Sequence, residues 1–297
     1  MLLSQTFKRI FIQIDESEGI KMKNNKLVLC LILALIMVLA LSACGQSAAQ
    51  PESAEEAPAK LVLGTSADYA PFEFMYPNDK GELVYGGIDI SVAQYIADFT
   101  GKELQVENMG FDYLLASLQK GDFDIVIAAM ESTEERLNSA DFSDPYYTDY
   151  PPMVLIKAEN ADQYTSTDSF ADKSVGAQTA TTKEDIVRND LTGASLVSLQ
   201  NVNDLVNQLV NEKIDAVVLD GAVALQFAAS NSDLAVAEID LGEAYPYRVA
   251  VAKGDPKGLL PGINEAIADM LEKGKVTEFE DSALSLEDVL VEVTAED

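Results

Sequence analysis

The sequence contains no histidine, and only two of its 297 residues are cysteine. Without histidine, a Ser-His-Asp or Cys-His catalytic arrangement is excluded, and so is metal binding through an imidazole. Cys30 lies in an apolar run near the start of the chain, and Cys44 follows that run. A disulfide framework is therefore not expected, and neither is a metal site or a cofactor.

Basic side chains are also scarce, because 20 Lys and Arg stand against 50 Asp and Glu, a formal net charge of −30. Setting residues 1–44 aside leaves 15 basic and 47 acidic side chains, a net charge of −32. Nucleic acids and anionic lipid surfaces are themselves negative, so neither is expected to bind this chain electrostatically. Most of the charge is interpreted as solvated surface.

The start of the chain has the pattern of an export signal. Residues 22–26 are basic, residues 27–41 form an unbroken apolar run, and Leu-Ser-Ala-Cys closes it at Cys44. The run is too short for a comfortable membrane span. Its closing residues resemble the lipobox of bacterial lipoproteins, which implies cleavage before Cys44 and a lipid on that cysteine. A plain N-terminal anchor helix is the alternative.

These features predict a signal peptide that ends at residue 43, preceded by an upstream extension if Met22 rather than Met1 is the true start. Residues 44–59 are small, polar and acidic, which is typical of a flexible tether. The expected location is extracytoplasmic, with the lipidated Cys44 anchoring the protein to the cell membrane.

From residue 60 onwards, patterns of strands and helices alternate. Apolar runs predict strands at residues 61–63, 125–128, 153–156, 175–177, 196–197, 214–219 and 249–251. Apolar residues three and four apart predict helices at 88–99, 111–118, 202–210 and 261–271, and a further helix from about residue 182. This alternation predicts an α/β fold with parallel sheets covered by helices on both faces.

Residues 124–147 contain the most informative corner of the chain. A short apolar strand is followed by a helix that Ser132 or Thr133 can cap, and Arg136 lies on that helix. Open α/β sheets bind ligands where a strand end leads into a helix start, and a guanidinium there offers a planar pair of donors to a carboxylate. The alternative is a surface arginine paired with an acidic neighbour, Glu134, Glu135 or Asp141.

Six motifs follow one another in order. They are GTSADYAPFE (64–73), GIDI (87–90), the helix 111–118, the arginine stretch with DFSDPYY (141–147), VGAQTATT (175–182) and IDAVVLD (214–220). Together they resemble the extracellular solute-binding proteins of polar amino-acid ABC importers, over nearly all of residues 60–285. The resemblance implies a two-lobed periplasmic-binding-protein fold of type II, in which two crossover strands join mostly parallel sheets flanked by helices.

In that fold the first lobe would comprise residues 60–150 and 246–297, the second lobe residues 151–245, and the ligand would lie between them. The resemblance implies that Arg136 holds the carboxylate of an amino acid and that Asp220 holds its ammonium group. The backbone amides of Thr181 and Thr182 would add donors to the carboxylate. Capping of the following helices is the alternative for Asp220 and for both threonines.

Tyr69 and Phe111 match the family positions that enclose the ligand side chain, although core packing is the alternative for Phe111. Ala128 and Ala129 depart from the family's small hydroxyl or glycine residues, so binding there would use backbone carbonyls. Glu131 is the third departure. If it faces Asp220, two carboxylates meet one ammonium group, which favours a cationic ligand such as lysine, arginine or ornithine.

Ser66 stands where some basic-amino-acid binders carry aspartate, which argues against a cationic ligand. Glu131 pointing to water is the alternative.

The sequence thus predicts a monomeric protein, not an enzyme, that binds a polar amino acid and delivers it to an ABC permease and its ATPase. One alternative is a dehydratase of cyclohexadienyl acids on the same fold, with Glu131 as general acid. Another is a ligand-sensing module.

Overall fold

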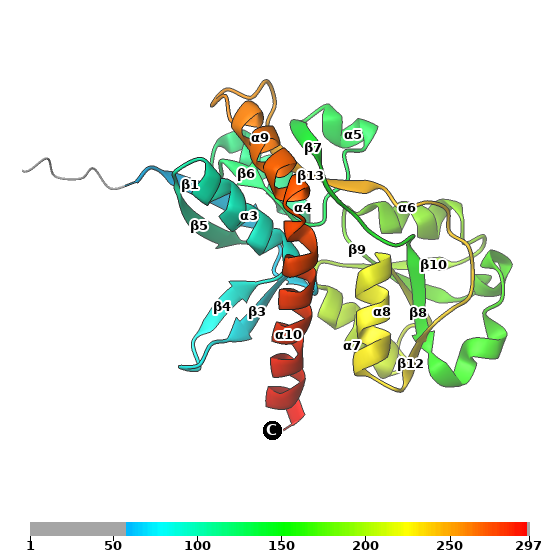
Figure 1. Ribbon diagram of the computed structural model, residues 1–297. Helices are drawn as coiled ribbons and strands as arrows, with labels where there is room; N and C mark the ends of the chain where they lie inside the picture. The colour runs from blue at the N-terminus through cyan, green and yellow to red at the C-terminus, as the bar shows by residue number, and fades with distance from the viewer. Residues whose placement is uncertain (1–57, 296–297) are drawn as a thin grey trace, which may run out of the picture. The chain divides into compact units, whose positions relative to one another are not determined.

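The computed structural model describes residues 58–295, and Figure 1 shows how their helices and strands are arranged. The predicted signal peptide, the predicted lipidation site at Cys44 and the predicted tether up to residue 57 lie outside the described part of the chain. Within residues 58–295, no helix combines the length and apolar character that crossing a bilayer requires.

The first sheet contains five strands: β1 Lys60–Thr65, β5 Glu103–Asn108, β6 Ile125–Val126, β7 Ala140–Thr148 and β13 Pro246–Ala252. Their order across the sheet is β5-β1-β6-β13-β7. β1 is parallel to β5 and β6, whereas β13 is antiparallel to β6 and β7. The sheet is therefore mixed, and the strand that returns late in the sequence closes it against β7.

Helices cover this sheet on two faces: α3 Ile88–Phe99, α4 Phe111–Lys120, α9 Leu260–Glu272 and α10 Lys275–Ala295. Leu61 and Leu63 of β1 pack in the same cluster as the buried faces of α3 and α9, whereas Val62 packs in the cluster of α4. Successive side chains of a strand point to opposite faces, which is why an uninterrupted apolar run suits this position.

The second sheet also contains five strands: β8 Met153–Lys157, β9 Ser174–Gln178, β10 Ser195–Leu199, β11 Ala216–Leu219 and β12 Leu234–Val236. Their order is β10-β9-β11-β8-β12, with β9 parallel to β10 and β11 and with β8 antiparallel to β11 and β12. The helical segments that follow these strands are η1 Ala158–Gln163, η2 Thr167–Phe170, α6 Thr182–Asn189, α7 Val202–Val210 and α8 Gly221–Ser230.

The chain passes between the two sheets twice. β7 leads to β8 through residues 149–152, and β12 leads to β13 through residues 237–245. Asp149, on the first passage, accepts hydrogen bonds from the Ala222 amide at 3.2 and 3.3 Å and from the Tyr247 hydroxyl at 3.1 Å. One buried carboxylate therefore joins the first passage to the start of α8 and to the strand that follows the second passage.

A small antiparallel sheet, β2 Asp68–Tyr69, β3 Glu73–Pro77 and β4 Leu83–Gly86, was not predicted, and neither were β5 and α10. β5 lies at a sheet edge and is largely exposed or half-buried, so it lacks an apolar run. α10 begins directly after Gly274, whose positive φ of 66° ends the preceding helix.

The strand predicted at residues 125–128 is shorter in the structure, where β6 ends at Val126. Ala129 then adopts a left-handed conformation with φ 43°, and its amide donates a 2.6 Å hydrogen bond to the buried carboxylate of Asp89. A strand does not continue through a residue in that region. The loop that follows β6 contains Glu131, which contacts Thr182 and Lys183 of α6.

Candidate functional site

Arg136 lies on the short helix α5, Glu134–Leu137, directly after this loop. Thr133 caps the helix by accepting a 3.2 Å hydrogen bond from the Arg136 amide, which confirms one of the two predicted caps. The predicted alternative was a surface arginine paired with an acidic neighbour. In the structure only 8% of Arg136 is exposed, and Asp141 pairs with Lys253 instead.

The Arg136 guanidinium is held from three directions. Its Nη1 donates to Glu131, at 2.8 Å to the carboxylate and at 2.9 Å to the main-chain oxygen. Its Nη2 donates to the main-chain oxygen of Ala180 at 3.1 Å, and its Cζ lies 5.1 Å from the centre of the Phe111 ring. Phe111 is thus a half-buried support for the guanidinium, a contact that a cation and an aromatic face both favour.

Glu131 does not point to water, since only 6% of it is exposed. Besides Arg136, its carboxylate accepts hydrogen bonds from the Thr182 hydroxyl at 2.9 Å and from Lys183 Nζ at 2.6 Å. Glu131 lies between β6 and β7 of the first sheet, and both partners are at the start of α6, which follows β9 of the second sheet, so this carboxylate bridges the two halves.

Lys183 is the residue that the sequence reasoning missed. It is 3% exposed, and its Nζ lies 2.6 Å from Glu131 and 2.5 Å from Asp220. A signal was present, because Lys183 directly follows the two threonines of the predicted site in a chain where acidic side chains far outnumber basic ones. The two carboxylates therefore meet the ammonium group of the protein itself, which removes the predicted reason for a cationic ligand.

Asp220 occupies the N-cap position of α8, yet its side chain makes no capping hydrogen bond. Its Oδ1 pairs with Lys183, and its Oδ2 accepts a 2.7 Å hydrogen bond from the Tyr69 hydroxyl. Asp149 bonds the Ala222 amide in the first turn of α8 in its place. The carboxylate of Asp220 is thereby left to face the other charged groups.

The charge states follow from burial and pairing. Burial alone would raise the pKa of Glu131, but Lys183 and Arg136 outweigh it and hold that pKa at about 2. Burial alone would lower the pKa of Lys183, but Asp220 and Glu131 raise it above its usual value. Burial, together with the charge of Glu131, raises the pKa of Asp220, although Lys183 opposes this.

Thr181, Thr182 and Ala129 complete the predicted set. The Thr181 amide bonds the Gln178 oxygen at 3.3 Å and its hydroxyl donates to the same oxygen at 2.6 Å, so both donors are engaged within the loop. Thr182 uses its hydroxyl toward Glu131. Ala129 is buried beside the site, with its amide bonded to Asp89.

Behind Ala129 lies a second pair of acids, Glu73 and Asp89, which are 1% and 0% exposed. Burial raises the pKa of Asp89 to about 6, although hydrogen bonds from the Ala129 amide and the Tyr146 hydroxyl oppose the shift. Burial and the neighbouring Asp89 raise the pKa of Glu73 well above its usual value. This pair holds protons more tightly than exposed acids do.

The side chains fill the site. The cavity bounded by Tyr69, Phe111, Ala129, Glu131, Lys183 and Asp220 measures about 10 Å³. Arg136 lines a wider cavity of about 530 Å³, and Glu131 lines another of about 350 Å³. Within residues 58–295, no group of His, Cys, Asp or Glu side chains is arranged to hold a metal ion.

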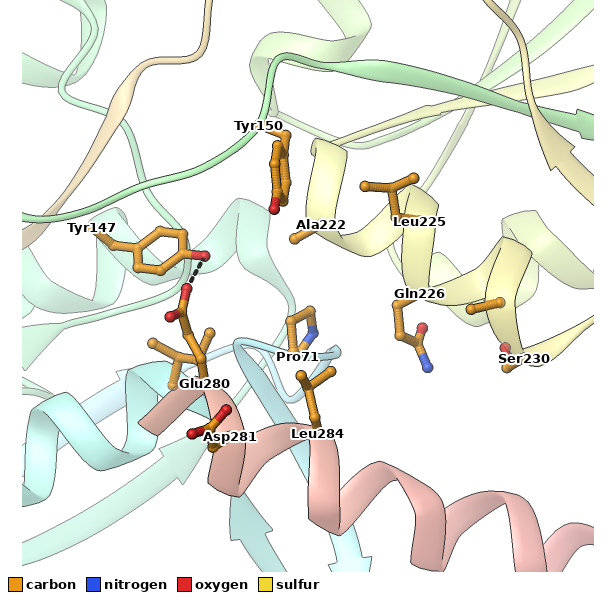
Figure 2. Close-up of a pocket in the computed structure, with 12 residues that line it drawn as sticks. Pro71, Tyr147, Tyr150, Ala222, Leu225, Gln226, Ser230, Glu280, Asp281 and Leu284 are labelled. Atoms are coloured by element: carbon orange, nitrogen blue, oxygen red, sulfur yellow. Dashed lines mark hydrogen bonds between the residues drawn. The ribbon is translucent and has the colours of Figure 1, made fainter. Parts of the chain in front are cut away.

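A larger cavity of about 730 Å³ lies elsewhere, between α8 and α10 (Figure 2). Tyr150 and Leu225 line one side and Leu284 the other, and the Tyr147 hydroxyl donates a 2.8 Å hydrogen bond to Glu280 at one end. The charged side chains among its described lining residues are Glu280 and Asp281. It therefore offers no counter-ion to a carboxylate, unlike the site around Arg136.

Comparison with known proteins gives one family. The model of the bacterial extracellular solute-binding proteins, family 3, matches residues 61–284. The arginine-binding extracellular protein ArtP of Bacillus subtilis is 31% identical over 84% of this chain and 94% of that protein. A probable histidine-binding protein of Campylobacter jejuni is 31% identical over 78% of this chain and 90% of that protein.

A solved structure is similar over the same region. The crystal structure of the amino acid ABC transporter substrate-binding protein AbpA from Streptococcus pneumoniae, bound to L-arginine, superimposes with a TM-score of 0.72. It is 34% identical in sequence and covers 76% of this chain and 95% of its own.

Proposed function

Because this chain belongs to the bacterial extracellular solute-binding proteins of family 3, we propose that it binds an amino acid between its two sheets and delivers it to an ABC permease and its ATPase. The observation that carries this proposal is the placement of opposite charges on opposite halves. Arg136 lies between β6 and β7 of the first sheet and Asp220 follows β11 of the second, and both are buried at one site.

The two ends of an amino acid match these groups. The Arg136 guanidinium and the start of α6 at Thr182 offer donors to its carboxylate, and a charged pair of this kind is stronger than a neutral hydrogen bond. Asp220, whose carboxylate the Tyr69 hydroxyl orients, accepts from its ammonium group. Phe111 supports Arg136 from beneath and so acts on the ligand through the guanidinium.

A basic amino acid is the ligand we propose. The relatives support it, since ArtP is named as arginine-binding and AbpA was solved with L-arginine. The walls of the wider cavity beside Glu131 support it as well, because they carry four further acidic side chains: Asp149, Asp185, Asp190 and Glu243. A cationic side chain that extends from the site would meet complementary charge there.

The site is proposed to bind and not to catalyse. A dehydratase that used Glu131 as general acid would need a raised pKa, so that the carboxyl carried a proton near neutral pH. Two neighbouring cations hold the pKa of Glu131 at about 2 instead. Incubation with a cyclohexadienyl acid, followed by absorbance, should show no turnover. A measurable rate would show that the protein is a dehydratase.

We further propose that the two lobes comprise residues 60–150 with 246–297 and residues 151–245, and that the protein works as a monomer outside the cell membrane. A lipid on Cys44 would attach it there. Labelling of cells with a tagged fatty acid should mark the wild-type protein and leave Cys44→Ser unmarked, whereas equal labelling of both would disprove the anchor.

Thermal shift and calorimetry with a panel of amino acids test the function. Arginine, lysine and ornithine should raise the melting temperature and bind with measurable affinity, because a ligand that binds only the folded state stabilises it by mass action. Glutamine and cystine are the neutral comparisons. Tight binding of neutral ligands alone would disprove the basic preference, and no response to any amino acid would disprove the proposed function.

A further inference from the structure

Glu131 and Lys183 lie at the two positions that the proposed function assigns to an amino acid. The Glu131 carboxylate accepts from Arg136 Nη1 at 2.8 Å and from the Thr182 hydroxyl at 2.9 Å. The Lys183 ammonium lies 2.5 Å from Oδ1 of Asp220, and Oδ2 of the same carboxylate accepts a hydrogen bond from the Tyr69 hydroxyl. A carboxylate and an ammonium group of the protein thus reproduce both ends of a zwitterion.

The site has no room for a second zwitterion beside this pair. Its remaining cavity of about 10 Å³ is no larger than one water molecule requires. The side chains of Arg136, Glu131, Lys183 and Asp220 are 4–9% exposed, so solvent does not separate these charges. An amino acid that reaches Arg136 and Asp220 must therefore replace Glu131 on the first and Lys183 on the second.

We propose, on the basis of the proposed function, that Glu131 and Lys183 form a resident ion pair that substitutes for the amino acid and that the ligand displaces. Glu131 belongs to the half of the first sheet and Lys183 to the half of the second, so the pair also holds the halves together. When the ligand displaces the pair, Glu131 and Lys183 still neutralise each other, because the two groups already lie 2.6 Å apart.

This exchange makes Lys183 a residue that determines specificity. A ligand with both a carboxylate and an ammonium group on one carbon supplies both replacements at once. A ligand with only a carboxylate leaves Lys183 paired with Asp220, and a ligand with only an amine leaves Glu131 paired with Arg136. Each such ligand therefore replaces only one of the two resident groups. The site then selects α-amino acids over amines such as agmatine, which is arginine without its carboxylate.

The test compares wild type with Glu131→Gln/Lys183→Met, in which both charges are removed and the volumes are kept. The double change leaves the net charge of the site unaltered, and the amide oxygen that Glu131→Gln introduces can still accept from the Arg136 guanidinium, so this variant is expected to fold even though Asp220 loses its cation. A second variant, Glu131→Ala/Lys183→Ala, covers the case in which the first packs poorly. Glu265→Gln on α9 and Lys173→Met, from a half-exposed ion pair with Asp215, are the matched controls.

Calorimetry should show arginine binding at least roughly tenfold more tightly to the double variants than to wild type, because the competent site is no longer occupied by the pair. The controls should keep the wild-type affinity. The preference for arginine over agmatine should shrink in the double variants. Weaker or unchanged arginine binding in both double variants would overturn the proposal, since it would make Glu131 and Lys183 direct contacts of the ligand or bystanders.

Small-angle scattering without ligand separates this proposal from the proposed function. The double variants should have a larger radius of gyration than wild type, because the tie between the halves is lost. If wild type binds amino acids but the variants match it in affinity and in radius, the resident pair is wrong and the function stands. If neither wild type nor the variants bind any amino acid while the radii of gyration differ as expected, the proposed function is wrong, but the ion pair still holds the two halves together.

Discussion

The Tyr69 hydroxyl donates a 2.7 Å hydrogen bond to the carboxylate of Asp220, which is 151 residues further along the chain and lies on the other half of the molecule. The Asp220 amide in turn donates to the same phenol oxygen at 3.1 Å. Two hydrogen bonds therefore join Tyr69 to Asp220, one of them to the carboxylate oxygen Oδ2, and the other carboxylate oxygen, Oδ1, faces the Lys183 ammonium group.

Tyr69→Phe is expected to weaken amino-acid binding by roughly 10- to 100-fold. A hydrogen bond to a charged group contributes about 1.5–3 kcal/mol, and its loss frees the Asp220 carboxylate to rotate. Calorimetry measures the change, with Tyr76→Phe on β3 as the comparison. Equal affinities for the wild type and Tyr69→Phe would mean that Tyr69 does not orient Asp220 for the ligand.

Arg136→Lys is expected to lose most of the affinity that Arg136→Ala loses, although it keeps the charge. A guanidinium presents two parallel donors to a carboxylate, whereas an ammonium group acts as a point charge and does not stack on the Phe111 ring in the same way. We expect a loss of about 2 kcal/mol or more, roughly 30-fold, in each variant. Near-wild-type binding by Arg136→Lys would show that charge alone suffices.

The stability of the protein should fall as the pH rises from about 4 to about 6, relative to Asp89→Asn. The pKa of Asp89 is raised from 3.8 to about 6, so the folded state holds a proton that the unfolded state has released. This stabilising contribution is complete below pH 4, is lost by about pH 6, and amounts to at most about 3 kcal/mol.

Urea unfolding at fixed pH values measures this difference. Glu73 faces Asp89 and has a raised pKa as well, so it adds to the effect in the same direction. At Asp89 itself, hydrogen bonds with the Ala129 amide, the Tyr146 hydroxyl and the Glu73 side chain oppose the rise in pKa. A constant difference between wild type and Asp89→Asn across this range would show that Asp89 titrates normally.

Gly221→Ala is expected to destabilise the protein and weaken binding. A Cβ on Gly221 would lie 2.5 Å from the Cβ of Tyr150 and 2.6 Å from the oxygen of Pro151, so α8 and the first passage must move apart. A cost of about 1–3 kcal/mol is typical of such crowding. Because Asp220 precedes Gly221, the shift would also displace the carboxylate that receives the ligand.

Gly262→Ala on α9 is the matched substitution. Its Cβ would meet only Thr100, at 3.5 Å, which is an ordinary contact. Alanine is favoured over glycine in a helix, so this variant should gain about 0.5–1 kcal/mol in the free energy of unfolding. A similar loss of stability in both variants would mean that the crowding at Tyr150 and Pro151 is not what limits position 221.

The predicted fold class is confirmed by the family match and by the similarity to AbpA. It was predictable because its signals are local: apolar periods of α4 and α7, and a threonine that caps α5. The small sheet of β2 to β4 has no such signal, since its strands are two to five residues long and mix exposed and buried positions.

The charge balance of the site was less accessible from the sequence. The sequence left two orientations of Glu131 open: toward Asp220, which would have favoured a cationic ligand, or toward water. Lys183 supplies the compensation from α6, 52 residues from Glu131. Nothing in the spacing of a helix start indicates that the second residue of the helix will reach across to two carboxylates, because that contact exists only after the two halves meet.

The bonds of Asp149 have a mechanical consequence. A single buried carboxylate accepts hydrogen bonds from the start of α8 and from the phenol of Tyr247, so the two passages between the sheets are expected to bend together. Asp220, the residue just before α8, would keep its position relative to this bending point. When the halves separate, Tyr69 and Arg136 would move away from Asp220, and the acceptor for the ammonium group would remain in place for the next molecule of solute.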